Sequence, residues 1–458
     1  MHSSTRAALF AEMQRLAYLC WCAAALQPPR YVVVYRGAHG GFRVPEFDAA
    51  RAGISGATLA PADETMAFSR ARRHCGGDVG PPLFMAASNA TAAELAAVAA
   101  RSVLVRAVVE LWGSGATYGA AAEDAAARGF APLAGTWRVC SMKVGAARGK
   151  TGGAALRSLS DRKVLGQLEP VLARLDGPVD LSEAADETVL VACDYDRAVD
   201  DHAHERPDPR TVYVGRLVAR GDRATRLKFS LKTRPFVGTT TMDPETAALM
   251  ARLARLEPGM AAVDPFAGTC GCLLAATHLT GAAATAADVD GDALRGALAN
   301  FDAAGLPRPT ILECPVDALV ERLGGAAFDA IVSDPPYGKR ERIAGGDARW
   351  LEELLGLADD ALKVGGRCVF FVPHGDDASA DDVAARVAAR APGYAVEASA
   401  QQRLSGPWRR TLVVLRKETS AARSTKGGAR DDLGAELSDY WKGRRAAVEA
   451  GRGTRGTH

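Results

Sequence analysis

A strand that runs into two consecutive prolines places the strongest constraint on how this chain can fold. Residues 328–332 (Phe-Asp-Ala-Ile-Val) are apolar and β-branched, as in a buried strand, and Ser-Asp-Pro-Pro-Tyr-Gly follows at 333–338. Proline cannot donate to a strand ladder and it restricts the residue before it, so the strand must end in a rigid loop. The loop therefore holds one carboxylate, backbone carbonyls and one aromatic ring at a strand end.

These groups suit the binding of a planar base that carries an amino group. Asp334 and the Pro335 carbonyl can accept two N–H hydrogen bonds, and Tyr337 can stack on the face of a ring. A tight Asp-Pro turn with a packed tyrosine would explain the same tetrapeptide without a ligand, because short motifs also arise by chance. The candidate catalytic residues are Asp334, Pro335, Pro336 and Tyr337.

Strand-like and helical stretches alternate through the second half of the chain. This rhythm predicts an α/β fold with a mostly parallel, doubly wound sheet of the Rossmann-like type, whose last two strands form a hairpin. In such a sheet, ligands bind at the carboxyl ends of the strands. The expected strands are 260–263, 283–289, 309–314, 328–333, 366–372, 395–404 and 412–416.

Loops after three of these strands carry residues that suit a nucleoside with an amino-acid end. The loop at 264–271 (Asp-Pro-Phe-Ala-Gly-Thr-Cys-Gly) opens a helix, whose N-terminal N–H groups can meet a carboxylate while its glycines allow close approach. Asp288 ends the next strand, where an acid can meet ribose hydroxyls, and Asp317 follows the third.

Each of these acids alone is more often a solvated loop residue, but their order over successive strand ends indicates S-adenosylmethionine as the cofactor. The cofactor-binding candidates are Asp264, Phe266, Gly268, Gly271, Asp288 and Asp317. Asp290 is expected to be solvated or to cap a helix, and Cys270 and Cys272 to act as small apolar residues.

The first half of the chain predicts an α+β region of short units. A Thr-x-x-Glu capping box at Thr91 opens one helix, Pro45 stands at the start of another, and Asp243 with Pro244 begins a third. Gly113-Ser-Gly115 is expected to end the strand before it. The expected strands are 31–35, 82–87, 103–112, 137–144, 189–195 and 211–219, with a helix at 118–127.

Composition limits the kinds of site and compartment that the chain can have. The net charge of +2 over 458 residues does not indicate a nucleic-acid binder, so any basic surface must be local. Nine cysteines without a Cys-x-x-Cys pair predict neither disulfides nor a zinc site, which favours a reducing compartment. The apolar stretch near the N-terminus is interrupted by Glu12 and Arg15 and is too short to span a bilayer, which favours a short helix or extension over a targeting segment.

The motifs together resemble a known family. Asp264-Pro-Phe-Ala-Gly-Thr, Asp288-Val-Asp290 and Asp334-Pro-Pro-Tyr337, in this order, are similar to the amino-methyltransferases that use S-adenosylmethionine. Three further stretches, 42–46, 101–112 and 231–245, resemble the eukaryotic tRNA guanosine-N2 methyltransferases that modify position 10. The resemblance covers about residues 31–417 and includes stretches outside the generic methyltransferase core.

The resemblance implies a cytoplasmic enzyme with tRNA as its substrate, a small zinc-containing activator subunit as its partner, and no membrane. It also implies that Thr240 lies beside the cofactor, although a plain helix-capping turn would explain the same residue. The alternatives are an rRNA guanine-N2 methyltransferase, a DNA amino-methyltransferase, and a non-catalytic RNA-binding scaffold. The expected segments are an N-terminal extension (1–30), a ferredoxin-like plus THUMP RNA-binding region (31–222), a linker (223–245), the methyltransferase domain (246–417) and a basic tail (418–458).

Overall fold

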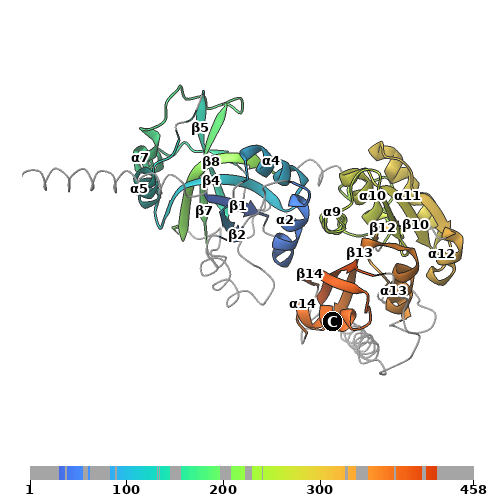
Figure 1. Ribbon diagram of the computed structural model, residues 1–458. Helices are drawn as coiled ribbons and strands as arrows, with labels where there is room; N and C mark the ends of the chain where they lie inside the picture. The colour runs from blue at the N-terminus through green and yellow to red at the C-terminus, as the bar shows by residue number, and fades with distance from the viewer. Residues whose placement is uncertain are drawn as a thin grey trace, which may run out of the picture.

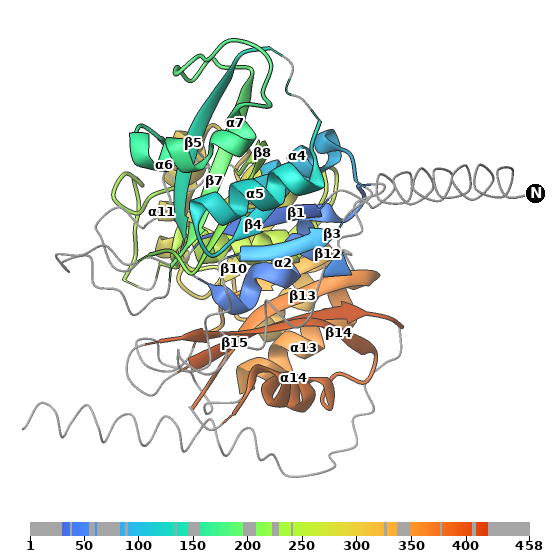
Figure 2. The same ribbon diagram turned by 90° about the vertical axis from the view of Figure 1, so that its left-hand side faces the viewer.

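The computed structural model shows one β-sheet in each half of the chain (Figure 1). Helices pack on both sheets (Figure 2). The two halves share one cluster of buried apolar residues. The structure describes residues 30–36, 39–54, 60–61, 83–87, 90–131, 133, 135–144, 156–195, 208–221, 229–239, 241–324, 328–336, 349–375, 378–404 and 409–419.

The first sheet confirms the predicted α+β character of the first half. Its neighbouring strands are antiparallel except β5 and β7, which run parallel. The strand order is β2 (Ala60–Pro61), β3 (Leu83–Ala87), β1 (Arg30–Tyr35), β4 (Val105–Gly115), β8 (Thr211–Arg220), β7 (Glu187–Asp194), β5 (Trp137–Val144) and β6 (Arg157–Ser158). The helical elements described in this half are η1 (Gly40–Phe42), α2 (Arg43–Arg51), α4 (Ala92–Arg101), α5 (Tyr118–Arg128), α6 (Arg162–Gln167) and α7 (Glu169–Leu172).

Local sequence signals explain where several of these elements begin, and one prediction fails. The Thr91 capping box is confirmed, because its side chain accepts from the Glu94 backbone N–H at the start of α4. The predicted break at Gly113 is wrong, because β4 continues through Gly115 and stays paired with β8. A Cβ at Gly113 would collide with the Ala125 backbone, so glycine here allows α5 to pack closely on a continuous strand.

The second sheet confirms the predicted doubly wound architecture. Its first five strands are parallel, while β15 runs antiparallel to both β13 and β14, which confirms the terminal hairpin. The order is β11 (Thr310–Glu313), β10 (Ala283–Asp288), β9 (Ala261–Asp264), β12 (Phe328–Ser333), β13 (Leu362–His374), β15 (Arg409–Lys417) and β14 (Tyr394–Arg403). The helices described are α9 (Pro244–Leu253), α10 (Gly271–Thr280), α11 (Gly291–Ala304), α12 (Val316–Leu323), α13 (Arg349–Ala361) and α14 (Ala380–Ala388).

The second sheet separates two apolar cores, and successive side chains of a strand face one core or the other in turn. In β12, Ala330 and Val332 face the core that contains α9, α10 and α11, whereas Ile331 faces the core that contains α12, α13 and α14. Helices therefore cover both faces of the sheet, as the period of two along a buried strand requires. None of the helices in the described part of the chain combines the length and the apolar character that crossing a bilayer needs.

The core beside α9 continues into the first half of the chain. Phe42 and Phe47 belong to the same buried cluster as Leu249 of α9 and Phe371 of β13. In Figure 1, α2 lies beside α9. Because one core is common to both halves, we infer that they pack as a unit rather than as two separate bodies.

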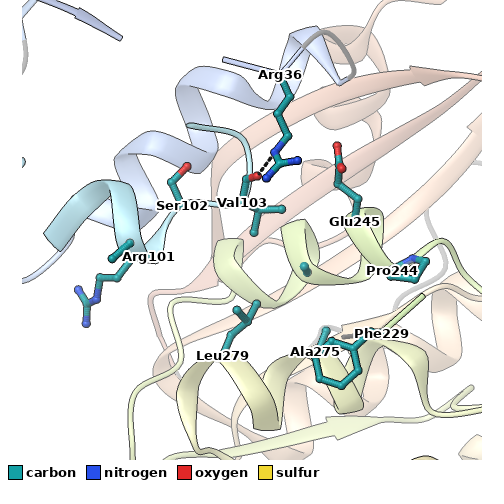
Figure 3. Close-up of a pocket in the computed structure, with 11 residues that line it drawn as sticks. Arg36, Arg101, Ser102, Val103, Phe229, Pro244, Glu245, Ala275 and Leu279 are labelled. Carbon is teal, nitrogen blue, oxygen red and sulfur yellow. Dashed lines mark hydrogen bonds between the residues drawn. The ribbon is translucent and has the colours of Figure 1, made fainter. Parts of the chain in front are cut away.

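A pocket lies along this seam, between the end of α4 and the helices α9 and α10. Arg36 stands at its rim and donates to the Val103 carbonyl at 2.9 Å (Figure 3). The empty volume of the pocket is about 450 Å³, which includes space that is open to solvent. The lining residues are Arg36, Ala100, Arg101, Ser102, Val103, Phe229, Pro244, Glu245, Ala248, Ala275 and Leu279.

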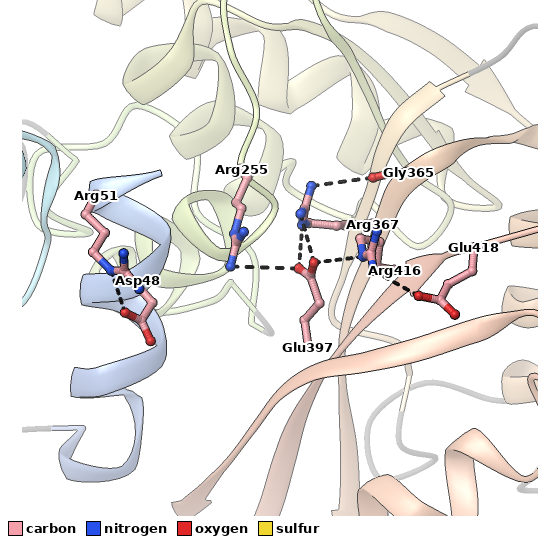
Figure 4. Close-up of polar contacts among 8 residues, drawn as sticks. All are labelled: Asp48, Arg51, Arg255, Gly365, Arg367, Glu397, Arg416 and Glu418. Atoms are coloured by element: carbon pink, nitrogen blue, oxygen red, sulfur yellow. Dashed lines mark hydrogen bonds and ion pairs between the residues drawn. The ribbon is translucent and has the colours of Figure 1, made fainter. Parts of the chain in front are cut away.

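One carboxylate gathers three arginines from different elements near the same seam. Glu397 of β14 accepts two hydrogen bonds from Arg367 of β13, at 2.7 and 3.0 Å (Figure 4). Arg416 of β15 lies 3.0 Å from it, and Arg255, just beyond α9, lies 4.0 Å away. These cations hold the pKa of Glu397 below its usual value despite its burial. The cluster therefore ties the antiparallel edge of the sheet to the end of α9.

Candidate active site

Three predicted acids lie at the carboxyl ends of neighbouring strands. Asp264 ends β9, Asp288 ends β10 and Asp334 follows β12, and these strands stand side by side in the sheet. Neighbouring parallel strands bring their carboxyl ends together, and the charges of Asp288 and Asp334 add to the rise in the pKa of Asp264 that burial causes. The sequence prediction that these residues converge at one edge of the sheet is therefore confirmed.

Asp264 makes its contacts inside the protein. Its side chain is 2% exposed, and one oxygen (Oδ1) accepts from the Ser333 hydroxyl at 2.6 Å and from the Phe266 backbone N–H at 3.1 Å. Burial raises the pKa of Asp264 to about 7, although these two hydrogen bonds act in the opposite direction. This carboxyl therefore fastens the loop after β9 to the end of β12, beneath the glycine turn.

The glycine turn at Gly268 faces open space. Gly268 has a φ of 48°, in the left-handed region, and a Cβ built there would meet no atom within 4 Å. Its N–H donates to Asp288 at 2.7 Å, and the next turn of chain leads into α10 at Gly271. The turn is thus held by Asp288 while its outer side stays accessible to a ligand.

The acids after β10 divide two tasks between them. Asp288 is half-buried and also accepts from the Asp290 backbone N–H at 2.9 Å. Asp290 in turn caps α11 by accepting from the Ala293 N–H at 2.9 Å, which confirms its predicted capping role. Asp317 is exposed in the first turn of α12, which follows the edge strand β11.

The threonine-rich segment before α9 lies against the glycine turn. The hydroxyl oxygens of Thr241 and Thr269 are 3.0 Å apart, and the Gly238 N–H donates to the Thr241 hydroxyl at 2.8 Å. Asp243 caps α9 by accepting from Thr246, as predicted. Thr240 itself lies outside the described residues, so its predicted cofactor contact stays a prediction.

Asp334 is held by an arginine that the sequence did not reveal. One Arg410 nitrogen donates to both Asp334 oxygens, at 3.1 and 3.0 Å. Pro335 is buried and Pro336 is half-buried, which fits a fixed loop. Tyr337 lies outside the described residues.

Sequence reasoning missed Arg410, Ser333, Thr241 and Thr269 as parts of this site. Arg410 stands 76 residues from Asp334 and belongs to no local motif, so only the pairing of β15 with β13 brings it there. Ser333 was visible inside the proline motif, and Thr241 is adjacent to the predicted Thr240. Cys270 before α10 and Cys272 within it are both buried, and burial raises the pKa of both thiols, so they behave as the small apolar residues predicted.

The two halves match two families of known domains. Residues 29–223 match the family described as the Tmrp11 THUMP N-terminal domain, and residues 232–381 match the RMKL-like methyltransferase domain. The chain thus combines a match to a THUMP N-terminal domain with a match to a methyltransferase domain. The glycine turn and the proline motif both fall within the matched methyltransferase domain.

Curated relatives are similar to this chain over part of their length. The tRNA (guanine(10)-N(2))-methyltransferase TRMT11 of Dictyostelium discoideum is 31% identical over 247 residues, which cover 46% of this chain and 47% of the relative. The tRNA (guanine(10)-N(2))-methyltransferase of Saccharomyces cerevisiae is 30% identical over 217 residues, which cover 38% of this chain and 50% of the relative. The chain thus spans about half the length of these relatives.

Two solved structures also align with the chain. TrmN from Thermus thermophilus aligns with a TM-score of 0.42 and 19% identity, over 85% of this chain and 99% of that one. A methyltransferase from Pyrococcus furiosus aligns with a TM-score of 0.31 and 19% identity, over 42% and 92% of the two chains.

Proposed function

We propose that this chain transfers a methyl group from S-adenosylmethionine to the exocyclic N2 amine of a guanosine in tRNA, at position 10. The observation that carries the proposal is the placement of Asp334, on its proline loop, at the same sheet edge as the Gly268 turn and Asp288. This edge is where an α/β sheet binds its ligands. The THUMP half, packed on the same core, and relatives named for this reaction support tRNA as the substrate.

The residues at the strand ends fit S-adenosylmethionine. The open space beside Gly268 can take the ligand, and the N–H groups that begin α10 at Gly271 suit its carboxylate. Each Asp288 oxygen accepts one hydrogen bond from a backbone N–H, and its remaining lone pair can accept a hydrogen bond from a ribose hydroxyl. In this proposal Asp264 and Phe266 shape the turn, whereas Asp317 and Thr240 complete the cofactor site.

S-adenosylmethionine, when bound, supplies an electrophilic methyl group on a positively charged sulfur. The exocyclic amine of guanine is a weak nucleophile because its lone pair is delocalised into the ring. If the Asp334 carboxylate and the Pro335 carbonyl accept its two hydrogens, the lone pair is turned out of the ring plane and toward the methyl group. We therefore expect these two residues to act mainly by orientation, and Asp334 also by charge stabilisation.

Two further steps fall to the same loop. After transfer the nitrogen carries an extra proton, which Asp334 accepts or passes to water. Tyr337 stacks on the guanine once it has left its helix, which lowers the cost of extrusion. Neither step requires a cysteine nucleophile, and the thiols of Cys270 and Cys272 are buried.

The proposal includes the organisation and partners of the chain. We assign tRNA binding to residues 31–222, a linker to 223–245 and catalysis to 246–417, between an extension (1–30) and a tail (418–458). The end of the THUMP match at residue 223 and the start of α9 at Pro244 support this division, whereas the methyltransferase match begins inside the linker, at residue 232. We also propose a small zinc-containing activator subunit as partner, because the resemblance implies it, and the cytoplasm as compartment, because the cysteine pattern favours a reducing one.

The test is transfer of labelled methyl groups to unmodified tRNA, ribosomal RNA and DNA, with the activator present. Label should enter tRNA, Asp334→Ala should lose transfer while still binding S-adenosylmethionine, and Asp302→Ala should match wild type. Asp302 is a suitable control because it pairs with Arg308 on the surface of α11, away from the site. Label in ribosomal RNA or DNA instead would overturn the tRNA assignment, and no transfer to any substrate would favour the scaffold.

A further inference from the structure

The ion pair between Asp334 and Arg410 is partly buried and fixed in its orientation, unlike a solvent-exposed ion pair. The Arg410 side chain is 11% exposed and that of Asp334 is 24% exposed, so water reaches the pair only in part. Both Asp334 oxygens receive a hydrogen bond from the same Arg410 nitrogen. A charge-assisted pair in this setting is stronger and better oriented than an exposed one.

Arg410 is itself fixed from two other sides. Its Nε donates to the side-chain oxygen of Gln402 on β14 at 2.7 Å. Its guanidinium carbon lies 3.8 Å from the centre of the Phe371 ring on β13. The guanidinium thus lies over an aromatic ring of one strand and is held at its edge by another, and a planar cation with several donors can make all three contacts.

The wall behind Arg410 is completed by the first half of the chain. Phe371 is fully buried, and its ring contacts that of Phe42 edge to face, with the centroids 6.4 Å apart. Phe42 belongs to η1, at the entrance to α2, and is 1% exposed. The surface on which Arg410 rests is therefore built partly by the half that contains the THUMP region.

The contacts of Arg410 fix the orientation of the Asp334 carboxylate, which the two prolines alone do not fix. The two prolines fix the backbone of the loop, but the carboxylate of Asp334 can still rotate, because its terminal torsion has broad wells. An amine whose hydrogens must be accepted at defined points needs a carboxylate with one orientation. The two bonds from Arg410 supply that orientation.

We propose that Arg410 is the positioning residue for Asp334, and that it acts on the reaction only through this carboxylate. The inference rests on the proposed methyl transfer. It differs from a structural role in its kinetic signature: turnover should fall, while the binding of cofactor and tRNA should not change. A small displacement of a reacting group can cost on the order of 100-fold in rate, so we expect kcat to fall by about 10- to 100-fold.

The experiment compares wild type, Arg410→Met, Arg410→Lys and Arg416→Met in tRNA methylation, each with the activator present. Arg416 is the matched control, because it lies on the same strand, six positions along, and pairs with Glu397 away from the site. Arg410→Met should lower kcat with KM for tRNA and Kd for S-adenosylmethionine unchanged. Arg410→Lys should restore only part of kcat, because an ammonium group cannot lie over the Phe371 ring and bond Gln402 and Asp334 at the same time.

A second variant guards against misfolding of Arg410→Met. Gln402→Met removes one hold on the guanidinium without touching Asp334, and should lower kcat by a smaller factor with KM unchanged. Full turnover in Arg410→Met, or a loss that resides in KM or Kd, would overturn the inference, as would full rescue by lysine. If wild type is active and Arg410→Met is equally active, only this inference fails; if wild type methylates no tRNA, the proposed function fails first.

Discussion

Replacing Asp264 with asparagine should remove a pH-dependent cost of folding. The buried oxygen Oδ1 accepts both internal hydrogen bonds, from Ser333 and from the Phe266 N–H, and the asparagine carbonyl oxygen can accept the same two. The substitution therefore keeps the contacts and removes the charge. Burial raises the pKa of Asp264 from 3.8 to about 7, so the folded protein binds this proton more tightly than the unfolded chain does.

The sign and size of the effect follow from that shift. This contribution to stability is fully present below the unfolded pKa of 3.8, and it is lost as the pH rises from there through the folded pKa of about 7. One pKa unit corresponds to about 1.4 kcal/mol, so ionised Asp264 costs the folded state about 4 kcal/mol at alkaline pH. Between about pH 8 and about pH 5 the wild type should regain about 2–3 kcal/mol, and the asparagine variant should not.

Urea unfolding of both proteins across this pH range measures the effect. Other titrating groups are common to both proteins, so the difference between their free energies of unfolding isolates Asp264. Asp302→Asn is the control, because its exposed carboxylate has a lowered pKa and titrates below the window. A difference between wild type and Asp264→Asn that stays constant with pH would refute the assignment of a raised pKa to this carboxyl.

Three further substitutions test other parts of the structure. Glu397→Gln leaves Arg367 short of its partner and should lower the free energy of unfolding by about 1–3 kcal/mol in urea titrations. The wild type should lose the same stabilisation as the pH falls through the lowered folded pKa of Glu397. A free energy of unfolding that does not change over this acidic range would contradict the assignment. Asp288→Ala removes the acceptor for the Gly268 N–H, and calorimetry should show S-adenosylmethionine binding weakened by about 10- to 100-fold; unchanged binding would exclude Asp288 from the site. Phe42→Ala opens a cavity in the shared core and should cost about 3–5 kcal/mol of unfolding free energy, whereas a cost below about 1 kcal/mol would show that the halves do not depend on this contact.

Local patterns predicted the sheet of the second half well because each strand is bounded by its own signals. The strand before the proline motif ends where expected, at Ser333, since proline stops the ladder. Asp264 and Asp288 could be placed at one edge for the same reason: in parallel strands all carboxyl ends meet together. The Thr91 capping box also needs only four consecutive residues to be recognised.

Features that depend on distant partners could not be predicted. Nothing near Arg410 in the sequence marks it as the partner of Asp334, because β15 reaches β13 only after the chain has passed through β14. The sequence suggested that Gly113 breaks the strand. Its actual role, leaving room for the α5 backbone, becomes visible only in the folded structure. The internal fastening role of Asp264 likewise depends on Ser333, on another strand.

The most direct test of the central claim identifies the nucleoside that carries the methyl group. Unmodified tRNA should be incubated with wild-type protein, S-adenosylmethionine and the activator, then digested and analysed by mass spectrometry, beside a transcript with adenosine at position 10. The proposal predicts N2-methylguanosine at position 10 of the first tRNA and no product from the second. A methyl group on another atom, or equal methylation of both transcripts, would contradict it.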